Sequence, residues 1–394
     1  MNTTERIFIR ENIDTDINRL LLSKGRYKEV DIEYCVNQIV ARKKGMGKLQ
    51  DWADNFDIEF PAHVSVEQSS SFSTALYKQR FCNGGIVADI TGGFGVDSWF
   101  LSQVSSGVDY FEINPDLFIT VKSNFTILKA ENIRVFNQSF TEFRDSLDNY
   151  DLIYADPSRR INENKRVIKL SDYEPSIPAI KRELFDKSER LLIKISPMAD
   201  ISATLEELPE TTQIHILSVK NECKELLFLL ERESKDIDPL VFGINMDETG
   251  RILSKFTFKR GEEGVAQNTI ADIPALYLYE PSGSIMKSGA FKLISSVYKV
   301  DKLHKHTHLY TSDILIPDFP GRVFNVLSVE EFSNRSINNL RKKIDKANIS
   351  ARNFPMSVNE LRHRLSIDDG GDKYIFGVTL KDDKRALIIC SKAD

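Results

Sequence analysis

The chain has 394 residues, of which 41% are hydrophobic and 28% are charged, and its formal net charge at pH 7 is −5. These values are ordinary for globular proteins and the length is enough for two or three cores, so they exclude a disordered or fibrous chain. No apolar run approaches the length of a membrane span and the first residues lack the pattern of an export signal, so we expect a cytoplasmic protein with no membrane partner.

Residues 1–80 are predicted to be mostly helical. Apolar residues recur at helical spacing, for example at Ile17, Leu20 and Leu21. A serine-rich stretch at 69–73 is typical of a helix cap and leads into a further helical run. We therefore predict an N-terminal helical domain at 1–80.

Between residues 81 and 235 the sequence alternates short apolar runs with helical periodicity, as a parallel sheet with helical crossovers requires. The last two runs are joined by a short connection that permits antiparallel pairing. We predict an α/β domain at 81–235 with strands at residues 85–90, 107–112, 133–138, 151–156, 190–196, 213–220 and 225–231.

A carboxylate and a glycine-rich loop follow the first predicted strand. The strand ends at Asp89, and Gly92, Gly93 and Gly95 let the backbone pass close to a ligand, because no Cβ stands in the way. The second strand ends at Glu112, whose carboxylate can accept two hydrogen bonds from a ribose diol. Since open α/β sheets bind ligands at the carboxyl ends of their strands, these residues predict a nucleoside site.

Two nucleoside cofactors compete for this site. A dinucleotide loop has a third glycine where this chain has Ser98. A sulfonium cofactor needs instead a carboxylate before the glycines and another after the second strand, as here. The segment resembles motifs I and II of class I S-adenosylmethionine-dependent methyltransferases, with Thr91 in place of the first glycine. This resemblance implies S-adenosyl-L-methionine as cofactor, bound by Asp89, Thr91, Gly92, Gly93, Gly95, Glu112, Gln138 and Ser139.

A third motif, Asp156-Pro157-Ser158-Arg159-Arg160, ends the fourth predicted strand. Methyltransferases that act on bases often carry an acid or amide, two prolines and an aromatic residue here. Ser158 and Arg159 replace the second proline and the aromatic residue, so methylation of an exocyclic amine is not implied. Asp156, Pro157 and Ser158 are the candidate catalytic residues, with Asp156 orienting the acceptor or taking its proton. Arg159 and Arg160 either bind a phosphate or base edge, or form salt bridges beneath a loop.

Beyond residue 235 the sequence predicts a hairpin, at 240–246 and 252–258, and then a second α/β unit with shorter elements. Residues 302–364 contain eleven Lys and Arg against six Asp and Glu, an excess of +5. A helix-like run there presents Arg341, Lys342 and Lys346 to solvent. These side chains are either contacts to RNA phosphates or an ordinary solvated face.

Histidines and cysteines are the remaining candidates for chemistry. His304, His306 and His308 alternate, which on one strand would place all three on one face. A metal would need further ligands, so we predict no metal site and favour an inert polar face or contact with RNA. The cysteines are scattered without paired spacing, which predicts reduced thiols, and Cys223 is more simply a buried small residue than a nucleophile.

Several segments together make the resemblance narrower. The chain is similar to the bacterial THUMP-like class I methyltransferases at residues 64–71, 156–160, 192–200, 219–224, 306–312, 319–322 and 352–355. This implies the seven-stranded class I sheet, a hairpin and linker at 236–275, a ferredoxin-like segment at 276–321 and a THUMP-like domain at 322–394. THUMP domains elsewhere hold structured RNA, so it also implies methylation of tRNA or rRNA. Lys194 and Ser196 end the fifth predicted strand, where they would contact the acceptor, but Lys194 is equally well an ordinary lysine with a buried stem.

The sequence therefore predicts S-adenosylmethionine-dependent methyl transfer to a structured RNA that the C-terminal unit captures. Two alternatives stay open. A non-catalytic RNA-binding protein would keep the cofactor as a structural ligand, and the missing aromatic residue after Pro157 favours this reading. A methyltransferase of a protein or small molecule would leave the basic segment without a nucleic-acid partner.

Overall fold

The computed structural model describes residues 1–22, 24–61, 63–143, 149–159, 169–234 and 237–393. The chain divides into two compact units. The first contains residues 1–214, 224–237 and 247–251, and the second contains residues 215–223, 238–246 and 252–394. No helix in the described part of the chain is both long and apolar enough to cross a membrane.

The N-terminal segment is helical, as predicted. Its helices are α1 (Thr3–Glu11), α2 (Ile17–Leu22), α3 (Ile32–Gly45), α4 (Gln50–Asp54), α5 (His63–Gln68) and α6 (Phe72–Lys78). Ser71 caps α6, and its side chain accepts a hydrogen bond from the backbone of Thr74. Trp52 and Phe60 share one apolar core with Phe100, so these helices and the sheet domain form a single body.

A nine-stranded sheet follows, in the order β11-β10-β8-β9-β7-β4-β1-β2-β3. The strands predicted between residues 81 and 235 are all present, and the predicted hairpin extends the same sheet as β10 and β11. The bounds are β1 (Gly84–Asp89), β2 (Ser105–Phe111), β3 (Ile133–Phe136), β4 (Leu152–Ala155), β7 (Arg190–Ile195), β8 (Thr211–Val219), β9 (Glu222–Glu231), β10 (Leu240–Met246) and β11 (Ile252–Lys259).

Strand register decides where the polar strand ends meet. Strands β1, β2, β3, β4 and β7 pair in parallel, whereas β9 runs antiparallel to β7. Asp89 on β1 lies opposite Tyr110 on β2 and Tyr154 on β4. The residues that follow these three strands therefore lie at one edge of the sheet, with β1 between β2 and β4.

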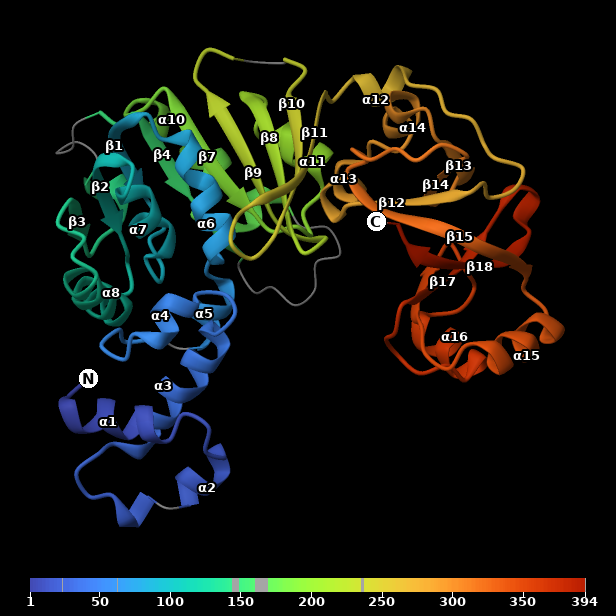
Figure 1. Cartoon of the computed structure of the whole chain (residues 1–394). Helices are drawn as coiled ribbons and strands as arrows, with labels where there is room; N and C mark the ends of the chain where they lie inside the picture. Colours follow the sequence, from blue (N-terminus) through green and yellow to red (C-terminus); the bar gives the residue numbers. More distant parts are fainter. Residues whose placement is uncertain (23, 62, 144–148, 160–168, 235–236, 394) are drawn as a thin grey trace. The chain divides into compact units, whose positions relative to one another are not determined.

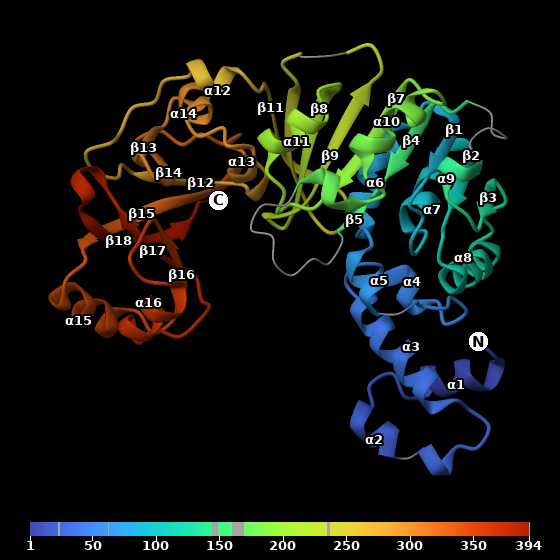
Figure 2. The ribbon, with the colours of Figure 1, turned by 180° about the vertical axis from the view of Figure 1, so that it is seen from behind.

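Helices cover both faces of this sheet. Figure 1 shows α6 and α7 (Val96–Ser102) over one face, and Figure 2 shows α10 (Ile177–Phe185) and α11 (Ile201–Glu207) over the other. Helix α8 (Pro115–Ile127) begins at the cap Asn114 with proline at its first turn. A short α9 (Phe140–Phe143) follows β3, and a two-stranded ribbon, β5 (Ser158–Arg159) with β6 (Tyr173–Glu174), follows β4.

The second unit contains a seven-stranded sheet in the order β13-β14-β12-β15-β18-β17-β16. Helices α15 and α16 pack on one face of its β16–β18 part (Figure 1). The bounds are α12 (Glu262–Val265), β12 (Tyr277–Pro281), α13 (Gly283–Ser288), α14 (Leu293–Tyr298), β13 (Asp301–His304), β14 (Thr307–Ser312), β15 (Gly321–Glu331), α15 (Asn334–Lys343), β16 (Asn348–Arg352), α16 (Val358–Leu365), β17 (Lys373–Thr379) and β18 (Arg385–Lys392).

Two expectations about the C-terminal segment are wrong. The three histidines do not share a strand, because β13 ends at His304, His306 lies in the turn and β14 begins at Thr307. Lys346 is not on the helix with Arg341. Helix α15 ends at Lys343 and the chain then becomes extended. Ala347 enters the apolar core, and the backbone of Lys346 forms an isolated β-bridge with Asp368.

Arg42 on α3 links this helix to the segment at residues 52–60. Its side chain is fully buried, and the guanidinium lies over the rings of Phe56 and Phe60, 4.7 and 4.8 Å from their centroids. Burial lowers its pKa to about 10. Its two terminal nitrogens donate hydrogen bonds to the backbone carbonyls of Trp52, Ala53, Asn55 and Ile58.

Replacing Arg42 with methionine should destabilise the first unit by about 3 kcal/mol, because several buried carbonyls lose their donors together. Urea unfolding followed by circular dichroism measures this change. Lys43→Met, at the exposed neighbouring position of α3, is the matched control and should stay within about 0.5 kcal/mol of wild type. Equal stability of the two variants would contradict a structural role for Arg42.

Candidate active site

A cavity of about 1130 Å³ opens at the edge of the sheet where β1, β2, β4 and β7 end. It lies within the first unit. Most of the predicted cofactor and acceptor residues line it, namely Asp89, Thr91, Gly92, Gly93, Gly95, Glu112, Gln138, Ser139, Asp156, Pro157, Ser158, Lys194 and Ser196. The sequence therefore identified residues that the fold brings together from five separate segments.

The glycine loop is shaped by close contacts that exclude side chains. A Cβ on Gly92 would lie 2.1 Å from the Tyr110 ring, and one on Gly95 would lie 2.7 Å from Val121 and Phe125. Gly95 has φ 77° and begins α7. The turn between β1 and α7 thus depends on glycine at both positions, and its backbone forms a wall of the cavity.

Glu112 is held rigidly at the end of β2. Its two carboxylate oxygens accept hydrogen bonds from the backbone N–H groups of Gly93 at 3.0 Å and Asn114 at 2.7 Å. Burial raises its pKa, although these donors offset part of the effect. The carboxylate therefore has a fixed orientation at the cavity wall, with Gln138 and Ser139 in the same lining.

Asp89 lies under the glycine loop and is almost fully buried. It accepts hydrogen bonds from the Ser98 hydroxyl at 2.5 Å and from the Thr91 N–H at 3.1 Å. Burial raises the pKa of Asp89 to about 7. Ser98, which occupies the place of a dinucleotide loop's third glycine, thus serves to hold this carboxyl group.

Asp156 and Lys194 form an ion pair in the cavity. The Asp156 N–H donates to the Thr91 hydroxyl at 2.6 Å, which fixes the turn after β4 against the glycine loop. Burial raises the pKa of Asp156, and Lys194 offsets part of this. Burial alone would lower the pKa of Lys194, but Asp156 and Glu225 reverse the effect and raise it. The lysine is therefore a permanent cation beside the carboxylate.

A buried charge network beneath the cavity was missed from the sequence. Lys78, at the end of α6, is fully buried and contacts Asp97 at 3.0 Å, Glu225 at 2.7 Å and the Ser70 hydroxyl at 2.8 Å. Asp97 also accepts a hydrogen bond from the Tyr154 hydroxyl at 2.7 Å. Burial would raise the pKa of Asp97, but Lys78 and Lys194 lower it to about 2.

No spacing rule connects these residues, because they come from α6, α7, β4 and β9. The one local signal is a lysine that ends a short helix beyond a serine-rich cap. Met198 was also missed. It lines the cavity after β7 with 84% of its surface exposed, which is unusual for a large apolar side chain.

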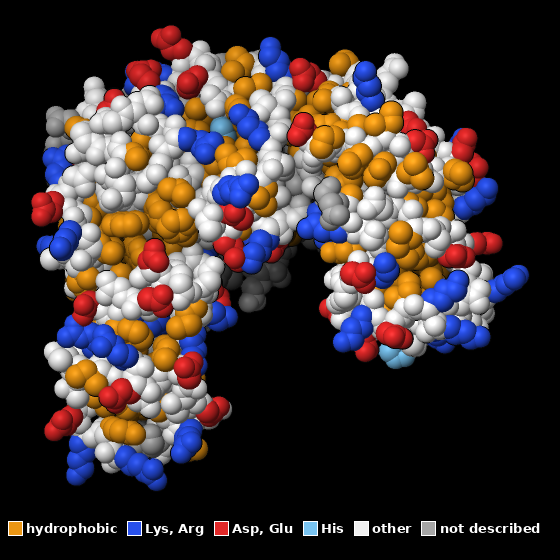
Figure 3. Space-filling model, in the orientation of Figure 1, with side chains coloured by type: hydrophobic (Ala, Val, Ile, Leu, Met, Phe, Trp, Pro, Cys, Tyr) orange, Lys and Arg blue, Asp and Glu red, His pale blue; other side chains and the backbone are white. Residues whose placement is uncertain are grey.

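The other predicted contacts lie elsewhere or are not described. Arg160 lies outside the described residues, and the structure describes only the backbone of Arg159, in β5. Arg341 and Lys342 lie on α15 in the second unit, where Arg341 donates to the backbone carbonyls of Arg364 and Leu365. On the face that Figure 3 shows, basic side chains over α15 and α16 are interspersed with acidic ones and form no continuous basic stripe.

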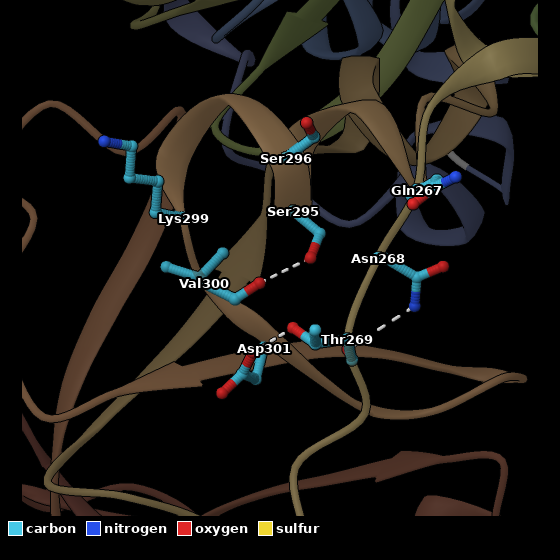
Figure 4. Close-up of a pocket in the computed structure, with 8 residues that line it drawn as sticks. All are labelled: Gln267, Asn268, Thr269, Ser295, Ser296, Lys299, Val300 and Asp301. Carbon is cyan, nitrogen blue, oxygen red and sulfur yellow. Dashed lines mark hydrogen bonds between the residues drawn. The ribbon is translucent and has the colours of Figure 1, made fainter.

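A smaller hollow of about 310 Å³ lies in the second unit (Figure 4). Several of its polar side chains bond to one another or to nearby backbone. Thr269 donates to Asp301, and Ser295 donates to the carbonyl of Val300. Lys299 points away from the other lining residues in Figure 4. This hollow has no group prepared for chemistry, and the large cavity is the candidate active site.

Comparisons with known proteins identify relatives of the chain. A family model described as a ferredoxin-like domain matches residues 277–320, and one described as THUMP domain-like matches residues 321–392. Ribosomal RNA small subunit methyltransferase J of Bdellovibrio bacteriovorus is 26% identical over 125 residues. That alignment covers 31% of this chain and 44% of the relative, so the chain matches less than half of its length.

The crystal structure of a Porphyromonas gingivalis W83 protein named as a methyltransferase is similar over almost the whole chain. The sequences are 32% identical, the match covers 99% of this chain and 98% of the other, and the TM-score is 0.88. The sheet order, the glycine loop and both C-terminal domain matches are consistent with this. The chain therefore belongs to the family of class I methyltransferases with ferredoxin-like and THUMP-like C-terminal domains.

Proposed function

We propose that this methyltransferase takes its methyl group from S-adenosylmethionine and transfers it to a structured RNA. The observation that carries the proposal is the cavity at the sheet edge, where the fixed Glu112 carboxylate and the glycine loop adjoin the Asp156–Lys194 pair. It combines a nucleoside-binding half with an acceptor-binding half. The RNA substrate is supported by the C-terminal domain match and by the ribosomal RNA methyltransferase among the relatives.

The residues present fit this cofactor. Glycine at 92 and 95 lets the loop pack closely on its neighbours, and the loop lines the cavity where the methionine part would lie. Glu112 would hold the ribose hydroxyls, with Gln138 or Ser139 toward the adenine and Asp89 beneath. The acidic groups suit a ligand with a positive sulfur. When bound, the cofactor supplies an activated methyl group.

The protein's own residues would position the acceptor and hold the proton that it carries. Asp156 can accept a hydrogen bond from an N–H or O–H of the acceptor, while Lys194 can donate to an adjacent oxygen or ring nitrogen. Holding the acceptor in line with the methyl group supplies most of the acceleration. The buried network of Lys78, Asp97 and Glu225 fixes the part of the cavity wall beside the Asp156–Lys194 pair.

Glu112→Ala should weaken S-adenosylmethionine binding by about 1.5–3 kcal/mol, because hydrogen bonds to a charged acceptor are lost. Isothermal calorimetry on both proteins measures the difference. Asp116→Ala, which removes an exposed carboxylate from the first turn of α8, is the control and should bind like wild type. Equal affinity of the Glu112 variant would remove this residue from the site.

Asp156→Asn should abolish turnover while leaving cofactor affinity nearly intact, since its interaction is made with the reacting group. The assay is transfer of labelled methyl to total RNA from a strain that lacks the gene, compared with RNA from the parent strain. Asp186→Asn, at an exposed position after α10, controls for the loss of one charge. Normal turnover in the folded Asp156 variant would exclude the role, and no transfer by wild type to either RNA would exclude RNA methylation.

Binding of S-adenosylmethionine should weaken as the pH falls from 8 to 6. Burial raises the pKa of Asp89 to about 7. A cationic ligand favours the ionised carboxylate, so below this pKa binding must first release a proton, which costs roughly tenfold in affinity per pH unit. Calorimetry at three pH values tests this, and Asp89→Asn should flatten the dependence. A wild-type affinity that is constant from pH 6 to 8 would contradict it.

A further inference from the structure

Two arginines of the second unit share one buried carboxylate. Glu280 on β12 has a side chain only 3% exposed, and Arg322 lies opposite it on β15. Arg322 donates to Glu280 Oε2 through Nε at 2.7 Å and also through Nη2. Arg352, the last residue of β16, donates to Glu280 Oε1 at 2.8 Å. We call these three residues the Glu280 cluster.

Backbone contacts hold both arginines in place. A Cβ on Gly321 would lie 2.0 Å from the Glu280 carbonyl oxygen, so β15 approaches β12 closely only because glycine precedes Arg322. After Arg352, the Asn353 side chain donates a hydrogen bond to Thr307 Oγ1 at 3.4 Å. The backbone carbonyl of Asn353 accepts a hydrogen bond from the Thr379 hydroxyl. The two guanidinium groups are therefore preorganised.

The Glu280 cluster has an excess of one positive charge. In the part of the chain that the structure describes, Glu280 is the one carboxylate paired with either arginine. The arginine side chains remain 40% and 42% exposed. Each guanidinium has five N–H groups, and hydrogen bonds to Glu280 and the Ala351 carbonyl use two on each. Several donors on each arginine are thus left for another ligand.

Stability alone does not account for this arrangement. One arginine is enough to pair a single buried carboxylate, and a half-exposed second ion pair adds little to stability. A carboxylate that fixes two guanidinium groups does, however, lower the entropy cost of binding an anion between them. Planar, fixed guanidinium groups are the preferred partners of phosphate oxygens.

We propose that the Glu280 cluster binds a backbone phosphate of the RNA substrate. The inference rests on the proposed function and names the contact by which the second unit would capture RNA. A phosphodiester carries one negative charge, which matches the excess charge of the cluster. The cluster and the methyl-transfer cavity belong to different units, so a polymer gains from both sites whereas a small acceptor does not.

The test is filter binding of labelled total tRNA and 16S rRNA to the full chain at increasing KCl concentrations. Arg322→Gln and Arg352→Gln should each weaken binding several-fold and flatten the log–log salt dependence by roughly 0.7–0.9 per lost phosphate contact. Each variant keeps the other arginine on Glu280, so the buried carboxylate stays paired. Arg385→Gln, an exposed arginine on β18, loses the same charge and should bind like wild type.

Melting temperature and S-adenosylmethionine affinity serve as folding controls. Where a glutamine variant melts early, Arg322→Lys or Arg352→Lys keeps the charge but removes the planar fork, and RNA affinity should still fall. Variants that match Arg385→Gln in affinity and salt slope would overturn the Glu280 site while leaving RNA methylation intact. A wild-type chain without RNA affinity at low salt would overturn both the site and the RNA part of the proposed function.

Discussion

The candidate active site depends on a buried cation, the ammonium group of Lys78. Removing an ammonium from water costs several kcal/mol, and only close opposite charges repay it. Asp97 and Glu225 supply these charges, and Ser70 adds a hydrogen bond. Because Lys78 ends α6 while Asp97 lies on α7 and Glu225 on β9, the ion pairs tie the N-terminal helices to the helix after the glycine loop and to the last strand of the first unit. The N-terminal segment is thus part of the active-site architecture.

The same network sets the charge of the cavity. Asp97 is ionised at neutral pH because Lys78 lies beside it, whereas Asp89 forms no ion pair with the residues that the structure describes and burial raises its pKa to about 7. Lys194 is already committed to Asp156. A positive charge that enters the cavity would therefore favour ionisation of Asp89, which is the property expected of a pocket for a sulfonium.

Sequence patterns predicted what depends on local structure and strand ends. Asp89, Glu112 and Asp156 each follow an apolar strand, and parallel register brings strand ends together whatever the side chains are. Lys78 could not be found in this way, because its partners are set by packing. Lys346 was misplaced since helical spacing continues past Lys343, while the requirement to bury Ala347 ends the helix earlier.

The structure also shows which of the excess positive charges of residues 302–364 are paired. Arg362 pairs with Asp369, which offsets its charge. The Arg341 side chain donates to two backbone carbonyls, so part of its hydrogen-bonding capacity is used within the fold. Arg322 and Arg352 are 30 residues apart in sequence, yet the strands bring both to one carboxylate that neutralises only one of them. A count of charges along a segment therefore locates a basic region but not its anion site, because only the pairing pattern shows which positive charge is left over.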